Sequence, residues 1–154
     1  VLRPLVAGKV NVPIVAAGGI TDGASMAAAF ALGAEGVQMG TRMVSAAESP
    51  VHDNWKQAIV QAAETDTVFL NRFSKPGLRA LRTERSSRLE HEEHVSMAEM
   101  ASALDLYFGG DMEASLALTG QVAGRIESVL PVEQIIHGTV DGFRRRVREV
   151  ASLL

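Results

Sequence analysis

VPIVAAGGITDGASMAAAFALGAEGVQMGTR, residues 12–42, decides the fold of this chain. Its first part is a β-branched run that ends in Gly18 and Gly19, which is typical of a strand buried on both faces of a parallel sheet. Small and apolar residues at 24–32 predict a helix, and a glycine ends it. A second short strand is predicted at 36–40. The stretch therefore forms a βαβ unit, whose crossover we expect to be right-handed.

Both predicted strands end in glycine, Gly18 and Gly19 in the first and Gly40 in the second, where Thr41 follows. The carboxyl ends of parallel strands meet at one edge of a sheet, and glycine lets backbone N–H groups approach an anion there. Each glycine group alone is as typical of an ordinary turn as of a ligand site. The two groups together, followed by Thr41 and Arg42, favour a phosphate site. In (β/α)8 barrels such a site follows strands seven and eight.

Several longer motifs are more specific: AAGGITDG at 16–23, ALGAEGVQMGTR at 31–42 and AAESPVH at 46–52. Together they resemble the nitronate monooxygenase family, formerly called 2-nitropropane dioxygenases. Flavin-dependent enoyl-acyl-carrier-protein reductases belong to the same superfamily, and weaker forms of the pattern occur in other phosphate-binding barrels. LRALR at 78–82 and GQVAG at 120–124 also match, so the resemblance covers nearly the whole chain.

The resemblance implies an α/β fold: the C-terminal part of a (β/α)8 TIM barrel, contributing its last two strands, followed by a mainly helical extension. We expect residues 1–65 to form the barrel part that binds FMN. Residues 66–154 are expected to pack on the barrel and on the flavin site. Such a barrel needs about 250 residues, whereas this chain has 154. We therefore expect the chain to be the C-terminal part of a larger enzyme.

The resemblance also implies which residues bind the cofactor. FMN is expected to lie against residues that follow the two strands: Gly18, Gly19, Gln38, Met39, Gly40 and Thr41. Gln121 is a further candidate, because the family's Gly-Gln-x-x-Gly segment lies near the flavin, with plain helix packing as an equal alternative. Relatives carry their catalytic histidine in the earlier half of the barrel, so no catalytic residue is assigned in this chain.

Three functions are compatible with these features. The first is an FMN-dependent oxidation of alkyl nitronates with O2, in which the flavin performs the redox chemistry. The second is an NAD(P)H-dependent enoyl-thioester reductase on the same scaffold. The third is a non-catalytic fragment that binds a phosphate ligand or completes another chain. The partners are accordingly a small nitronate or enoyl thioester, with O2 or NAD(P)H.

Composition indicates a globular protein that is 47% hydrophobic and 21% charged, with a net charge of −3. No apolar run approaches the roughly 20 residues of a membrane span, so we expect no membrane contact. The acidic balance does not favour nucleic acid as a partner. The chain has no cysteine, which excludes disulfides and thiolate metal sites. Without a signal-like segment, a cytoplasmic location is expected, and an oligomer is compatible with the sequence.

Downstream of the βαβ unit, an apolar stripe that includes Trp55 predicts a helix after Ser49-Pro50. We expect Trp55 to serve packing rather than flavin stacking. Two short apolar runs, 67–70 and 78–81, flank a Pro-Gly turn and predict a hairpin. The pattern further predicts a helix over 85–108.

Two more helices are predicted at 120–129 and 132–153, separated by a proline. His91-Glu92-Glu93-His94 resembles a zinc-protease motif, but its two histidines are three residues apart instead of four. Surrounded by glutamates, this run is more typical of a solvated face. No metal site is therefore predicted.

Overall fold

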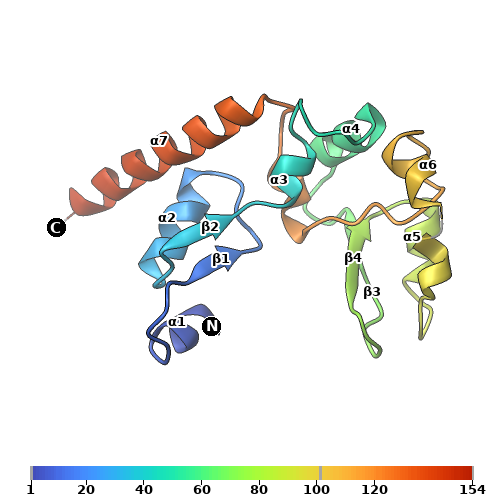
Figure 1. Cartoon of the computed structure of the whole chain (residues 1–154), viewed down its shortest axis with the longest axis horizontal. Coiled ribbons are helices and arrows are strands. Elements are labelled where there is room, and N and C mark those ends of the chain that lie inside the picture. The colour runs from blue at the N-terminus through green and yellow to red at the C-terminus, as the bar shows by residue number, and fades with distance from the viewer. Residues whose placement is uncertain (1, 101, 154) are drawn as a thin grey trace.

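The computed structural model describes residues 2–100 and 102–153 and shows an elongated α/β arrangement (Figure 1). The βαβ unit and the long C-terminal helix lie at one end, and a hairpin with short helices lies at the other. The elements in chain order are α1 Leu2–Ala7, β1 Val15–Ala17, α2 Gly23–Ala31, β2 Gly36–Gln38, α3 Thr41–Val44, α4 Asp53–Gln61, β3 Thr67–Leu70, β4 Leu78–Leu81, α5 Glu84–Leu89, the 3-10 helix η1 Met97–Met100, α6 Ala103–Tyr107, the 3-10 helix η2 Gln121–Arg125 and α7 Val132–Ala151.

The predicted βαβ unit is confirmed, with shorter strands than expected. β1 pairs in parallel with β2, and Ala17 lies opposite Gln38 at the carboxyl ends. Asp22 caps α2 by accepting a hydrogen bond from Ser25 N at 2.7 Å, and the Ser25 side chain accepts from the Asp22 amide in return. This capping box fixes where the helix begins after the glycine loop.

Burial of β1 on both faces, which the sequence predicts, does not occur within this chain. Ala16 is buried at 3% exposure, whereas Val15 on the opposite face is 61% exposed. Successive residues of a strand point to opposite faces, so only one face of β1 is covered by the described residues. Val12, just before the strand, is exposed as well.

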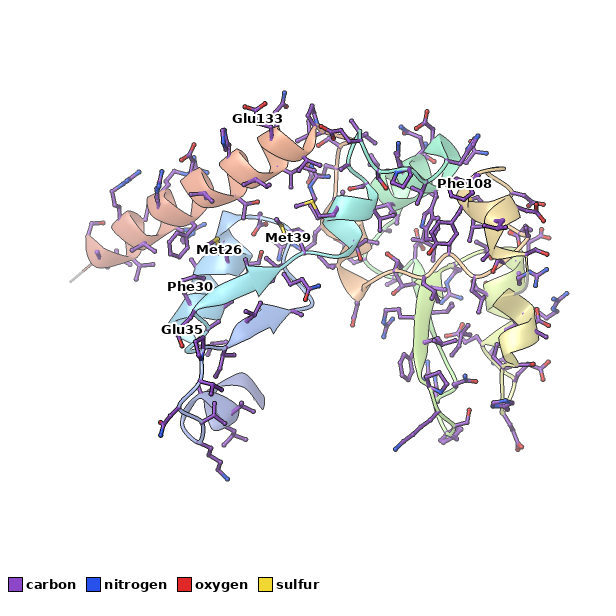
Figure 2. All side chains as sticks on the ribbon, viewed as in Figure 1. Met26, Phe30, Glu35, Met39, Phe108 and Glu133 are labelled. Atoms are coloured by element: carbon purple, nitrogen blue, oxygen red, sulfur yellow. The ribbon has the colours of Figure 1, made fainter. Side chains whose placement is uncertain are left out.

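Helix α7 begins near α3, after the chain has crossed back from the hairpin, and lies along α2 (Figure 1). The two helices touch at glycines, because a Cβ added to Gly23 would collide with the backbone of Gly142 and Phe143. Beside this crossing the rings of Phe30 and Phe143 pack with their centroids 5.0 Å apart, and Figure 2 shows Phe30 on α2 facing α7. The prediction of a helix at 132–153 is confirmed by α7.

The extension shares a hydrophobic core with α4, which precedes it in the chain. β3 and β4 form the predicted antiparallel hairpin, with Leu70 opposite Leu78. Trp55 and Ile59 of α4 are 1% and 0% exposed and pack with Leu106. Trp55 also meets Tyr107 edge-on at a ring distance of 4.8 Å. The prediction that Trp55 serves packing is therefore confirmed.

The predicted continuous helix over 85–108 is wrong. The chain forms α5, then an irregular stretch, η1 and α6, and residue 101 lies outside the described residues. The cause is Val95, which is buried at 2% exposure and donates its N–H to Asn71 Oδ1 at 2.7 Å. That contact comes from the hairpin, so sequence periodicity does not reveal it.

The predicted helix at 120–129 is shorter than expected. A 3-10 helix covers Gln121–Arg125, and the chain then continues without helix to Leu130, which bridges Ala46. Among the described residues, no helix is long and apolar enough to cross a membrane.

Candidate functional site

A hollow of about 280 Å³ opens where β1 and β2 end. Three separate segments line it: Ala17, Gly18, Gly19 and Ile20 after β1, Gln38, Gly40 and Thr41 after β2, and Gly120 and Val122 at η2. The structure therefore brings together five of the seven residues that the sequence analysis singled out. We call this space the strand-end hollow.

The glycines of the strand-end hollow leave room against the backbone. Gly18 and Gly19 have φ of +84° and +78°, the left-handed region that L side chains rarely adopt. A Cβ built on Gly18, Gly19 or Gly40 would meet no described atom within 4 Å. The space that side chains would occupy is thus open, as a bound group lying against the backbone requires.

Thr41 is half-buried and already takes part in a hydrogen-bond network. Its Oγ1 accepts from Gly120 N at 2.8 Å, and the Thr119 hydroxyl lies 3.4 Å away. A hydroxyl accepts at its lone pairs while keeping one hydrogen to donate. Thr41 is therefore suited to donate to an acceptor in the hollow.

Met39 and Gln121 do not line the strand-end hollow. Met39 follows β2, and the alternation of residues along an extended chain turns it to the side opposite Gln38 and Gly40. It packs toward α7, with Thr139 Oγ1 4.0 Å from its sulfur, and Figure 2 shows it beneath that helix. Gln121 is exposed at the start of η2. Its neighbours Gly120 and Val122 contribute instead, and only the GQVAG motif pointed to this segment.

Arg42, which follows Thr41, is buried at 7% exposure. Its Nη1 donates to Ser45 Oγ at 2.9 Å and to the carbonyl of Ser128 at 2.7 Å. Burial lowers the pKa of Arg42, although a guanidinium stays protonated throughout the working range. The residue thus joins α3 to the segment that leads into α7.

Asp22 and Arg125 form an ion pair at 2.7 Å beside a second hollow of about 450 Å³, which Arg42 also lines. Burial by itself would raise the pKa of Asp22. The hydrogen bonds from Ser25 and the charge of Arg125 outweigh it, so the pKa is lowered. Asp22 is therefore ionised at neutral pH and ties the start of α2 to η2.

The strand-end hollow contains no acid, base or strong nucleophile. Of the side chains that line it, only those of Gln38 and Thr41 are polar. The described residues also contain no group of three or more His, Asp or Glu side chains that would hold a metal ion.

The sequence profile of the family described as nitronate monooxygenase matches residues 1–142. The chain belongs to the nitronate monooxygenase family. A probable nitronate monooxygenase of Staphylococcus saprophyticus is 45% identical over 83 residues, which are 54% of this chain and 23% of that protein. The match therefore covers less than a quarter of that relative.

Two solved structures are similar in fold. FabK from Thermotoga maritima matches 100% of this chain and 51% of its own length, with 40% identity and a TM-score of 0.92. A nitroalkane oxidase from Streptomyces ansochromogenes matches 97% of this chain and 44% of its own, with 24% identity and a TM-score of 0.78. This chain spans about half of each.

Proposed function

We propose that the protein carrying this chain is an FMN-dependent oxidoreductase that oxidises alkyl nitronates with O2. The observation that carries the proposal is the strand-end hollow, in which two glycine groups leave open space at the shared edge of β1 and β2. Membership of the nitronate monooxygenase family supports the reaction class.

The residues of the hollow fit the phosphate end of FMN. The backbone at Gly18, Gly19 and Gly40 leaves room for phosphate oxygens to approach, and the Thr41 hydroxyl has a hydrogen to donate. Gln38 lines the same hollow, and its side-chain amide can both donate and accept hydrogen bonds. When bound, FMN supplies the redox chemistry, while these residues bind and orient it.

We further propose that residues 1–65 are part of the barrel and that residues 66–154 form an extension packed against it. The exposed face of β1 supports this division, because Val12 and Val15 are more than half exposed. In a complete barrel, neighbouring strands and the interior layers of side chains cover such residues. The catalytic base is then expected from those other elements.

An NAD(P)H-dependent enoyl-thioester reductase is the second candidate. It is favoured by the likeness to FabK, an enoyl-acyl-carrier-protein reductase, which is 40% identical over the whole chain. The nitroalkane oxidase is only 24% identical and indicates the fold alone.

The visible absorption spectrum of the purified protein tests the proposal. We expect a flavin spectrum, and release of FMN on denaturation. Anaerobic bleaching by an alkyl nitronate, with little bleaching by NAD(P)H, would support the first candidate, and the reverse would support the second. A colourless protein that does not take up added FMN would overturn both and favour a non-catalytic fragment.

A further inference from the structure

The third wall of the strand-end hollow comes from a distant part of the sequence. Gly120 lies 79 residues after Thr41, yet the two are joined by the 2.8 Å hydrogen bond from Gly120 N to Thr41 Oγ1. Figure 1 shows the chain crossing back from the hairpin side of the molecule toward α3 before it enters α7. We call residues 117–124 the return segment.

The first half of the return segment is fixed by the hairpin. Thr119 N donates to the carbonyl of Arg79 at 3.0 Å, and Leu81 N donates to the carbonyl of Ala117 at 2.9 Å. These bonds place residues 117–119 beside β4 in antiparallel orientation, like a third strand at the edge of the hairpin. Gly120 follows directly, so the hairpin sets where its amide points.

The second half of the return segment is fixed by α4. Ala123 is completely buried in the core that contains Trp55. A Cβ on Gly124 would lie 2.6 Å from the backbone of Ala63 and Glu64, so these backbones are in direct contact. Gly120 is therefore held from both sides and does not move without disturbing the core of the extension.

The hydrogen bond between Gly120 and Thr41 has a fixed direction. A backbone N–H only donates, so the Thr41 hydroxyl accepts from Gly120 and, at 3.4 Å, from the Thr119 hydroxyl, and its own hydrogen remains for another acceptor. Accepting one hydrogen bond also strengthens the next donation in a chain of hydrogen bonds. A hydroxyl held in this way is matched to an anion in the hollow.

We propose that Gly120 is a positioning residue, whose amide orients the Thr41 hydroxyl so that the extension sets how tightly an anionic group is held in the strand-end hollow. The inference rests on the proposed flavin function. It also accounts for the lack of a side chain at position 120, since a Cβ there would lie 3.0 Å from Thr41 Oγ1 and 3.3 Å from Val122 Cγ1. With φ of −84°, the backbone of Gly120 itself tolerates alanine.

The test compares the affinity of the flavin-free protein for FMN and for riboflavin, which lacks the phosphate. We expect Gly120→Ala to lower the preference for FMN over riboflavin by about tenfold, the effect of one hydrogen bond to a charged group. Thr41→Val removes the hydroxyl and is expected to have a similar effect, whereas Thr41→Ser keeps the oxygen and the wild-type preference. Because the preference is a ratio within one protein, partial unfolding does not change it.

The double variant decides whether Gly120 acts through Thr41. In the Thr41→Val background we expect Gly120→Ala to cause no further loss of preference, because contacting residues that act as a unit are not additive. Gly138→Ala is the matched control, since a Cβ at Gly138 meets no described atom within 4 Å. It should keep the wild-type preference.

Two results would overturn the inference while the proposed function stands: an unchanged preference in Gly120→Ala, or full additivity in the double variant. Equal affinity of the wild-type protein for FMN and riboflavin would show that no phosphate is held in the hollow, and would overturn the placement of FMN and the role of Gly120 together. Absence of any flavin binding by the wild-type protein would overturn the proposed function and this inference alike.

Discussion

The two sheets of this chain differ in how much of their surface the chain itself covers. In the parallel sheet Val15 of β1 is 61% exposed, whereas in the antiparallel hairpin Val68 of β3 is fully buried. The hairpin and its helices complete a core from residues of this chain alone. The βαβ unit has an uncovered face and an open glycine edge instead. The buried core is thus concentrated in α4 and the extension, whereas the proposed ligand site lies at the open edge of the parallel sheet.

The largest effect is expected where the extension is most closely packed. Trp55→Ala should lower the free energy of unfolding by about 3–5 kcal/mol, because it empties a buried site within the core of the extension. Thermal unfolding of the variant measures this. Trp55→Phe keeps most of the apolar volume and should cost much less, and equal losses in both variants would contradict a packing role.

The next prediction concerns Gly40, at the open edge of the parallel sheet. Gly40→Val should weaken FMN binding by about a hundredfold or more, equivalent to about 2.7 kcal/mol, because the added side chain fills space that the ligand needs. The melting temperature of the flavin-free protein should stay close to that of the wild type, since a Cβ at Gly40 meets no described atom within 4 Å. A variant that retains FMN at the wild-type level would show that the phosphate lies elsewhere.

A smaller effect is expected at Asp22, which connects the two regions. Asp22→Ala removes the cap of α2 and the ion pair with Arg125, and a lost cap typically costs about 1 kcal/mol. Because folding lowers the pKa of Asp22 from its ordinary value of 3.8, the charged carboxylate stabilises the protein fully above that pH. That contribution is lost as the pH falls through the lowered pKa.

The measurement is the difference in unfolding free energy between the wild type and Asp22→Ala across an acid titration. The difference should be largest near neutral pH and should shrink below about pH 4. Asp22→Asn keeps a capping oxygen but no charge. Its free energy of unfolding at neutral pH should lie between that of the wild type and that of Asp22→Ala. A difference that grows on acidification would contradict the assigned sign.

The smallest effect separates Gln38 from Gln121, the two glutamines that the sequence offers as candidates for binding FMN. Gln38→Ala should weaken FMN binding measurably, because Gln38 lines the strand-end hollow. Gln121→Ala should leave the affinity unchanged within error, because its exposed side chain does not line that hollow. Titration of FMN into both flavin-free variants makes the comparison, and a greater loss in Gln121→Ala would reverse the assignment.

Much of the fold follows from local signals in the sequence. Glycine stops and apolar periodicity predicted the βαβ unit, the helix with Trp55, the hairpin and α7. The prediction failed where one residue has a distant partner: Val95 is held by Asn71 at 2.7 Å, which interrupts the expected helix. At the site, the glycines and Thr41 could be predicted from the sequence. The sequence does not show which residue of the GQVAG motif lies beside them.

By itself, the sequence determined the family and the glycine-tipped edge of a parallel sheet, because positive φ values and close backbone approach require glycine whatever surrounds it. Only the tertiary structure decided that Met39 turns toward α7, that Gln121 stays outside the hollow and that Gly120 donates to Thr41. The placement of Gln121 and Gly120 depends on how the hairpin and α4 hold residues 117–124. These positions are determined by packing between elements that are far apart in the sequence, and local residue propensities contain no information about such packing.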